Sequence, residues 1–220
     1  MEMPSTEMPS RDMLDKIFPG WEPRCEPAPI RAGLKKCNEL LIGNFMASGV
    51  PPKYHQAQVS DFETDLSQYS RKSVFIHGKR GNGKTHMAVA LQKEWIWGQM
   101  SDRRQWGFMD SYFVSVSDLM IKLRSGFNNK GVEQEGEMIQ RLCNAPLLIL
   151  DDIGTMPGTD YAFQVLYVII NERYNWERAT ILTSNDSLSV LNDQFSEAIA
   201  SRLYEMCDII ELDGKDYRNK

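Results

Sequence analysis

The chain has 220 residues, of which 42% are hydrophobic, and a formal net charge of −5 at pH 7. This length predicts one full domain with a short appendage, and the acidic balance excludes a protein that coats nucleic acid through overall basic charge. The first residues show neither a basic nor an apolar signal region, so we expect no secretory leader, and the longest apolar stretch, 163–170, is too short to cross a bilayer. We therefore expect a cytoplasmic protein that has no membrane partner.

The first sixty residues differ in composition from the rest of the chain. Residues 1–29 contain six of the ten prolines, which predicts an extended arm. Apolar residues then recur at helical spacing until Pro51 ends the predicted helix, which either packs against its own domain or is presented to a partner protein. The recurring residues are Leu34, Cys37, Leu41 and Phe45.

The four cysteines of the chain include no C-x-x-C pair, so we expect reduced thiols and no zinc site.

From residue 73 onward, strand-like and helix-like runs alternate. Several of the strand-like runs are apolar on both faces, which is typical of a parallel sheet covered by helices on both sides. We therefore predict an α/β fold with a five-stranded parallel sheet. The predicted strands are 73–78, 111–116, 146–152, 179–185 and 208–212, and the predicted helices are 84–100, 117–123 with Ser117 as its cap, 161–174 and 196–206.

A phosphate-binding loop follows the first predicted strand. Residues 78–85 read GKRGNGKT and match G-x-x-x-x-G-K-[ST], the Walker A pattern, with a strand before it and a helix after it. Glycines allow the main chain to turn its N–H groups toward phosphate oxygens, and the helix N-terminus adds positive charge. We expect Lys84 to reach the β- and γ-phosphates and Thr85 to bind Mg²⁺. The predicted nucleotide-binding residues are Gly78, Lys79, Arg80, Gly81, Asn82, Gly83, Lys84, Thr85 and His86.

Two acids follow the apolar run LLIL, which is a Walker B arrangement. We predict that Asp151 orients Mg²⁺ through its waters and that Asp152 polarises the attacking water. A pair of acids at a buried strand end is costly unless a metal ion neutralises it. Asn185 follows the next strand, and because ligands bind at the carboxyl ends of parallel strands, we expect it to hold the lytic water beside the γ-phosphate. The sequence thus predicts an enzyme that hydrolyses ATP to ADP with Mg²⁺.

These motifs together resemble the DnaC/DnaI/IstB group of AAA+ ATPases over about residues 62–219. The resemblance implies an AAA+ P-loop fold, which we expect here with a short helical N-terminal extension and without a C-terminal lid domain. It divides the chain into residues 1–60, an arm and helix that form a helicase-binding region and linker, and residues 61–220, the ATPase domain. The segments that carry the resemblance are the Walker A loop, LLILDDIG, NERY, ATILTSN and SRLYEMCDIIELDGKDYR.

The resemblance implies an ATP-dependent helicase loader. Such a protein binds a hexameric DnaB-type replicative helicase and delivers it to single-stranded DNA, assembles into a ring or spiral, and hydrolyses ATP between subunits. Two alternatives stay open: an IstB-like ATPase that assists a transposase, and a nucleotide-gated adaptor or inhibitor that binds the helicase without loading it. The compact chain suggests a version from a phage or a mobile element.

The resemblance also implies roles for residues outside the two Walker motifs. Arg202, late in the chain on a predicted helix, matches an arginine finger that acts on the neighbouring subunit's nucleotide. Arg218 resembles the last arginine of the family and is expected to touch the phosphates. The expected DNA contacts are Phe127, Thr159 and Tyr161, with charge from Lys122, Arg124 and Lys130.

Three features depart from the family pattern. Only about ten residues separate Phe62 from the first strand, where the family usually has a helix over the adenine, so the sequence does not predict how the base is held. Asp152 stands where many AAA+ ATPases have Glu, and its side chain is one methylene shorter, which favours slow hydrolysis. Only two residues follow Arg218 in the sequence, which leaves no room for a helical lid domain, so we expect none.

Overall fold

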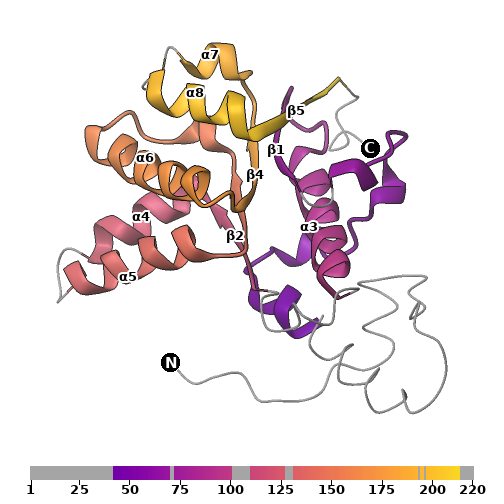
Figure 1. Cartoon of the computed structure of the whole chain (residues 1–220), viewed down its shortest axis with the longest axis horizontal. Coiled ribbons are helices and arrows are strands. Elements are labelled where there is room, and N and C mark those ends of the chain that lie inside the picture. Colours follow the sequence, from indigo (N-terminus) through magenta and orange to yellow (C-terminus); the bar gives the residue numbers. More distant parts are fainter. Residues whose placement is uncertain are drawn as a thin grey trace.

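The structure is a computed structural model that describes residues 42–69, 72–100, 110–126, 131–192, 194–195 and 197–213. Across these ranges, five strands form one sheet in the order β2-β3-β4-β1-β5 (Figure 1), and every neighbouring pair is parallel. The strands are β1 (Ser73–Gly78), β2 (Ser111–Ser115), β3 (Leu147–Asp151), β4 (Ala179–Ser184) and β5 (Cys207–Leu212). The predicted α/β fold with a five-stranded parallel sheet is therefore confirmed.

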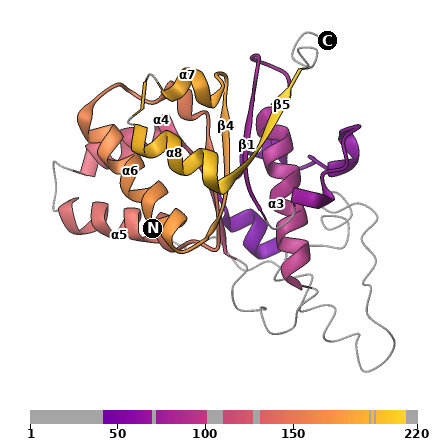
Figure 2. The same cartoon turned by 45° about the horizontal axis from the view of Figure 1, so that its top comes forward.

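Helices cover both faces of the sheet. Figures 1 and 2 show α3 on one face together with residues 42–69, and the other helices on the opposite face. Helix α5 packs on α4 and α6. The helices are α3 (Lys84–Met100), α4 (Val116–Gly126), α5 (Gly131–Asn144), α6 (Asp160–Asn175), α7 (Leu188–Asn192) and α8 (Glu197–Met206). Within the described ranges, no helix has both the length and the apolar character that a bilayer crossing requires.

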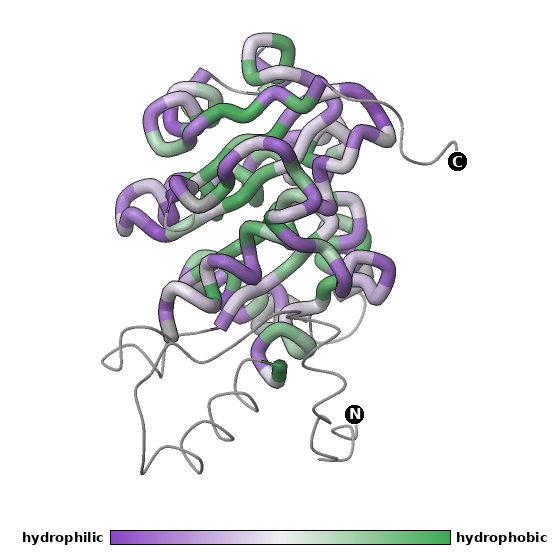
Figure 3. The backbone as a smooth tube through the Cα atoms, turned by 90° about the vertical axis from the view of Figure 1, so that its right-hand side faces the viewer, coloured by the Kyte–Doolittle hydropathy of each residue, from purple (hydrophilic) through white to green (hydrophobic). Residues whose placement is uncertain are grey.

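The central strands are apolar on both faces because each face has a hydrophobic core of its own. Successive strand residues point to opposite faces, so Val74 and Ile76 pack toward α3 while Phe75 packs toward α4, α6 and α8. Leu147 and Leu148 of β3 divide between the two cores in the same way. Figure 3 shows hydrophobic stretches of chain running through the middle of the molecule. The sheet is therefore rigidly held between two packed layers.

Most of the predicted elements are confirmed, but two helices and one helix cap were not predicted correctly. The sequence analysis placed no helix at 131–144 or at 188–192, where the structure has α5 and α7. Ser117 does not cap its helix, because α4 already begins at Val116. The Ser115 hydroxyl instead accepts a hydrogen bond from the N–H of Asp118 at 3.5 Å, while the Ser117 hydroxyl bonds to Thr155.

The segment before the first strand packs into the core. Residues 42–47 are helical, and Phe45 is 0% exposed. The carbonyl of Ser48 accepts a hydrogen bond from the N–H of Phe113 at 2.7 Å, which covers part of the outer edge of β2. The sequence analysis left two interpretations of this helix open. The residues that the structure describes, 42–47, pack against their own domain. The apolar core on the α3 face begins well before residue 60 and includes Ile42, Phe45, Val50, Ala57 and Leu66.

Arg173 joins three elements from within the interior. This residue of α6 is 0% exposed, and its guanidinium donates hydrogen bonds across to the end of α5 and the start of β4. Burial lowers the pKa of Arg173 to about 9. The negative end of the α5 dipole lies at the same carbonyls and favours a cation there. The acceptors are the Thr180 hydroxyl and the carbonyls of Leu142, Cys143, Ala145 and Ala179.

We predict that Arg173→Leu lowers the free energy of unfolding by about 3 kcal/mol or more, since several buried carbonyls lose their donor at once. Urea denaturation followed by circular dichroism measures the change. Arg141→Ala, at an exposed position near the end of α5, is the matched control and should shift the unfolding free energy by no more than about 0.5 kcal/mol. Equal, small shifts for both variants would contradict the structural role of Arg173.

Candidate nucleotide site

The phosphate loop connects β1 to α3, and its shape depends on the close approach of Gly78 to the main chain of Leu212. Gly78 has φ +144°, and a Cβ atom there would overlap the carbonyl oxygen of Leu212 at the end of β5. Asn82, within the loop, donates a hydrogen bond from its side chain to the same carbonyl. Only glycine fits at position 78, because both the dihedral angle and the space exclude a side chain. The loop is therefore held against the end of β5.

Lys84 lies across the mouth of this loop. Its ammonium group donates to the carbonyls of Gly78 and Lys79, both at 2.8 Å, and to Oδ1 of Asn82 at 3.3 Å. The side chain is buried, being 8% exposed, and these acceptors satisfy its charge. Phosphate oxygens are stronger acceptors than neutral carbonyls, so a bound triphosphate can draw the ammonium group away from the loop.

The two acids predicted as Walker B are joined to β4 through one hydroxyl. Thr183 Oγ1 donates to Oδ1 of Asp151 at 2.7 Å and accepts from the N–H of Asp152 at 2.8 Å. Thr85 of the phosphate loop donates to the same Asp151 oxygen at 2.9 Å. Burial raises the pKa of Asp151, although the Thr183 and Thr85 hydroxyls act in the opposite direction. The carboxylate therefore lies in a position where a cation would stabilise its charged form.

Asp152 has a backbone conformation that turns its side chain toward β4. Its φ is 59° and its ψ is 55°, in the left-handed region that non-glycine residues rarely adopt. Asn185 Nδ2 donates to Oδ1 of Asp152 at 3.0 Å, so the acid and the amide predicted to act on the lytic water are direct neighbours. Local strain of this kind is kept at functional sites when the surrounding contacts hold it in place.

The residues present fit a magnesium ion. Thr85 and Asp151 offer hard oxygen ligands within hydrogen-bond distance of each other, and Mg²⁺ commonly takes one or two carboxylates together with substrate phosphates rather than a cage of protein ligands. In the part of the chain that the structure describes, no group of three or more His, Cys, Asp or Glu side chains could hold a metal by itself. When bound, Mg²⁺ would neutralise charge that develops on the phosphates during transfer.

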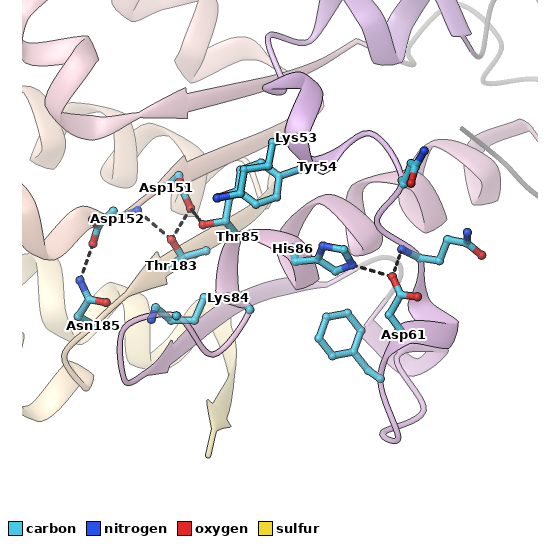
Figure 4. Close-up of a pocket in the computed structure, with 15 residues that line it drawn as sticks. Lys53, Tyr54, Asp61, Lys84, Thr85, His86, Asp151, Asp152, Thr183 and Asn185 are labelled. Carbon is cyan, nitrogen blue, oxygen red and sulfur yellow. Dashed lines mark hydrogen bonds and ion pairs between the residues drawn. The ribbon is translucent and has the colours of Figure 1, made fainter. Parts of the chain in front are cut away.

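These residues line a single cavity of about 780 Å³, shown in Figure 4. Its volume lies within the range of about 300–1,000 Å³ that is common for ligand pockets. Figure 4 shows Asp151, Asp152 and Asn185 at one end, Lys84 and Thr85 in the middle, and the pair of Asp61 and His86 at the other end. The lining residues are Lys53, Tyr54, Gln56, Gln58, Asp61, Phe62, Gly81, Gly83, Lys84, Thr85, His86, Asp151, Asp152, Thr183 and Asn185.

The end of the cavity away from the acids is formed by residues that sequence reasoning missed. Two short 3₁₀ helices, η1 (Pro52–Tyr54) and η2 (Val59–Asp61), lie just before Phe62, where the sequence analysis predicted only a linker. They present Tyr54 and Gln58 to the cavity. The spacing of Gln58 and Asp61, which form a reciprocal capping box, was the one sequence signal for this turn.

The remaining predicted residues lie away from this cavity or outside the described residues. Arg202 does not line the cavity, and its guanidinium donates to Asn171 Oδ1 at 3.0 Å and to the Ala198 carbonyl at 2.7 Å. Thr159 is the N-cap of α6, where its hydroxyl accepts from the N–H of Ala162 at 3.3 Å. Phe127, Lys130 and Arg218 fall outside the described residues, so their predicted roles stay predictions.

Tyr161 has a structural partner in the region predicted to contact DNA. Its hydroxyl donates to Oε1 of Glu135 in α5 at 2.6 Å. Burial and the neighbouring carboxylate raise the pKa of Tyr161 to about 12. Nearby, Arg124 donates to the Thr159 hydroxyl at 3.3 Å. The predicted DNA contacts in the described region therefore combine an aromatic ring, a hydroxyl and a cation, with an acid among them.

A parallel sheet with a phosphate loop after β1, two acids after β3 and a polar residue after β4 defines an AAA+ P-loop ATPase. Residues 46–220 match the family described as IstB-like ATP binding protein, and the chain belongs to that family. The prediction of the DnaC/DnaI/IstB family of AAA+ ATPases is therefore confirmed, and with it the prediction of an ATPase.

The chain is similar to helicase loaders and to insertion-sequence proteins. It is 24% identical over 145 residues to the replicative helicase loader DnaC of Escherichia coli K12, covering 66% of this chain and 53% of that protein. It is 24% identical over 174 residues to the ATP-binding protein of insertion sequence IS232 from Bacillus thuringiensis, covering 77% of this chain and 64% of that protein. The chain thus spans between half and two thirds of the length of these relatives.

A solved structure supports the same relationship. The crystal structure of the DnaC helicase loader superposes with a TM-score of 0.60 and 25% sequence identity, covering 74% of this chain and 100% of that chain.

We predict that Lys84→Ala abolishes ATP binding and lowers ATP hydrolysis by about 10³-fold, because the site loses its principal phosphate-facing cation. Fluorescence titration with a labelled ATP analogue and a phosphate-release assay measure the two effects. Lys79→Ala is the matched control, since Lys79 is exposed and does not line the cavity, and the substitution keeps the main chain through which this residue belongs to the loop. If Lys84→Ala binds ATP as tightly as Lys79→Ala does, the phosphate site is wrongly assigned.

Proposed function

We propose that this protein is an ATP-dependent helicase loader, which binds a hexameric DnaB-type replicative helicase and delivers it to single-stranded DNA. The observation that carries the proposal is the similarity to DnaC, a replicative helicase loader, in both sequence and solved structure. The family match over residues 46–220 includes the sheet and the residues that line the cavity, where we expect ATP to bind. The helicase and the DNA are proposed partners.

The cavity supports a division of work among its side chains during hydrolysis. Lys84 and Thr85 line the cavity, and we expect them to hold the β- and γ-phosphates with their metal ion. Asp152 accepts a hydrogen bond from Asn185, and together they form a pair that can hold and polarise a water molecule. The Asp152 side chain is shorter than the Glu of many AAA+ ATPases, so we expect slow turnover. Slow turnover suits a protein that acts while ATP is bound.

Arg202 is proposed to act on the nucleotide of a neighbouring subunit. It lies on α8, and its guanidinium carbon is 5.2 Å from the ring centroid of Tyr167 and 5.7 Å from that of Tyr174, both in α6. These rings and the Asn171 side chain hold the cation at a half-buried position. Tyr167 and Tyr204 are exposed, which gives this face the aromatic character common at protein interfaces. A ring or spiral of subunits would bring this face to a neighbour's cavity.

The DNA-binding part of the proposal is centred on the ends of α4 and α6. Lys122 and Arg124 are exposed on α4, and Thr159 and Tyr161 lie at the start of α6. Aromatic side chains can stack on bases, while hydroxyls and cations bind phosphates. Phe127 belongs to the same proposal from its place in the sequence. Binding of single-stranded DNA here would have to displace Tyr161 from Glu135.

The N-terminal region is proposed to bind the helicase. Residues 1–41 lie outside the described residues, and the helical residues 42–47 that follow them pack against the ATPase core through Phe45. Met46 of the same helix is 42% exposed, so this helix also keeps an outward face. A partner that holds the N-terminal region would therefore act close to the core of the ATPase.

We predict that the full chain forms a stable complex with the DnaB-type helicase of its host in the presence of ATP, and that the complex transfers the helicase to single-stranded DNA. Size-exclusion chromatography with light scattering measures the complex, and unwinding of a forked substrate measures loading. Absence of a complex, with or without ATP, would remove the loader from consideration.

Assays of DNA preference and of transposase stimulation, added to the helicase experiment, separate the alternatives. A preference for bent duplex DNA over single strands, with stimulation of a transposase, would favour the IstB-like role, which is supported by the similarity to the IS232 protein. A helicase complex that forms but never loads would favour an adaptor or inhibitor. In that case Phe127→Ala and Tyr161→Ala should leave activity unchanged, whereas a loader should lose binding to single-stranded DNA with either substitution.

We predict that Arg202→Ala keeps ATP binding but abolishes hydrolysis in the assembled protein, with a loss of about 10³-fold or more in rate. Phosphate release is measured at protein concentrations above and below the assembly midpoint. Arg141→Ala, which removes an exposed arginine near the end of α5, controls for the loss of one charge. Normal hydrolysis by Arg202→Ala at high protein concentration would show that the finger is wrongly assigned.

A further inference from the structure

Residues 52–62, which we term the strap, lie along α3 and close one end of the nucleotide cavity. Six of the residues that line the cavity come from this segment: Lys53, Tyr54, Gln56, Gln58, Asp61 and Phe62. The phosphate loop and the acids come from the sheet edge, which is held between two cores. The strap contains only short 3₁₀ turns. Its position therefore depends on contacts with α3.

The first contact is at the start of α3. His86 Nε2 is 2.6 Å from Oδ2 of Asp61, and the rings of His86 and Phe62 are 5.9 Å apart between centroids. The N–H of Gln58 also donates to Oδ2 of Asp61 at 2.9 Å, so this carboxylate joins the strap's own turn to the helix. Burial opposes the charge on Asp61, but the bonds from His86 and Gln58 outweigh it and lower the pKa of Asp61.

The second contact lies two turns further along the same face of α3. Lys93 is seven residues after His86, and residues at this spacing face the same way about 10.5 Å apart along the axis. Its ammonium group donates to the carbonyl of His55 at 2.6 Å. The same group lies 5.2 Å from the centroid of the Phe45 ring, which packs edge-on against the ring of His55.

Lys93 is unusual because a lysine side chain is rarely buried. It is 5% exposed, and burial lowers its pKa to about 8, with Asp61 acting in the opposite direction. A buried lysine is costly unless its hydrogen bonds compensate for lost water. The His55 carbonyl and the Phe45 ring supply part of that compensation; His55 belongs to the strap, and Phe45 belongs to the helical residues that precede it.

We propose that Lys93 and Asp61 are positioning residues for ATP hydrolysis: they hold the strap over the nucleotide cavity and so set how long the nucleotide stays bound. The inference rests on the ATPase activity of the family and not on the helicase partner. Because Lys93 touches Phe45 as well as His55, the strap and the helical residues 42–47 share one anchor on α3. Displacing those helical residues would loosen the strap.

The experiment measures release of a labelled ATP analogue with Mg²⁺ from the full chain by stopped-flow fluorescence. Asp61→Ala removes the first contact at an exposed position, and Lys93→Met removes the second while keeping an apolar stem against Phe45. We expect each to speed nucleotide release by about tenfold, as for loss of one hydrogen bond to a charged group. We also expect KM for ATP to rise more than kcat falls. Glu63→Ala, an exposed acid two residues beyond Asp61, is the matched control and should release nucleotide at the wild-type rate.

The double variant tests whether both residues act through the strap. If they do, Asp61→Ala with Lys93→Met should speed release by less than the product of the single effects. Unchanged release from a folded Asp61→Ala protein would overturn the proposal, even if Lys93→Met proved too unstable to measure. A fall in kcat alone, with release unchanged, would also overturn it. Failure of the wild-type protein to bind the analogue would instead count against the ATPase site itself.

Discussion

The site depends on two hydrogen bonds made by the hydroxyl of Thr183. By donating to Asp151 and accepting from the N–H of Asp152, it fixes both acids to β4 and holds Asp152 in its left-handed conformation. This is possible because β3 and β4 are neighbours with parallel register, so that their carboxyl ends meet at one edge. The same edge receives the phosphate loop after β1, which pairs with β4 on its other side. One hydroxyl thus connects the acid predicted to bind the metal, the acid predicted to polarise water, and the sheet.

The two layers that cover the sheet are built differently. On one face, α4, α6 and α8 bury a continuous core, and Arg173 connects α5, α6 and β4 from inside. On the other face, α3 continues directly from the phosphate loop and carries the strap and residues 42–47 on its surface. Nucleotide binding at the start of α3 and packing of the N-terminal segment along α3 are therefore properties of one helix.

Much of the site could be predicted from the sequence because its residues follow strands in short, recognisable patterns. Lys84, Thr85, Asp151, Asp152 and Asn185 meet in one cavity as their strand-end positions predicted. The parallel sheet was equally predictable, since apolar strands with two buried faces have few other solutions.

What the sequence concealed depends on contacts between distant segments. Thr183 reads as an ordinary strand residue until its register with Asp151 is known. The strap was missed because 3₁₀ turns have no periodic pattern, and α5 because its polar outer surface obscures its apolar stripe. The most direct test of the account is a crystal structure with a non-hydrolysable ATP analogue and Mg²⁺. It should show Lys84 on the β- and γ-phosphates and the metal between Thr85 and Asp151, whereas a nucleotide bound elsewhere, with Lys84 still on the carbonyls of Gly78 and Lys79, would contradict the account.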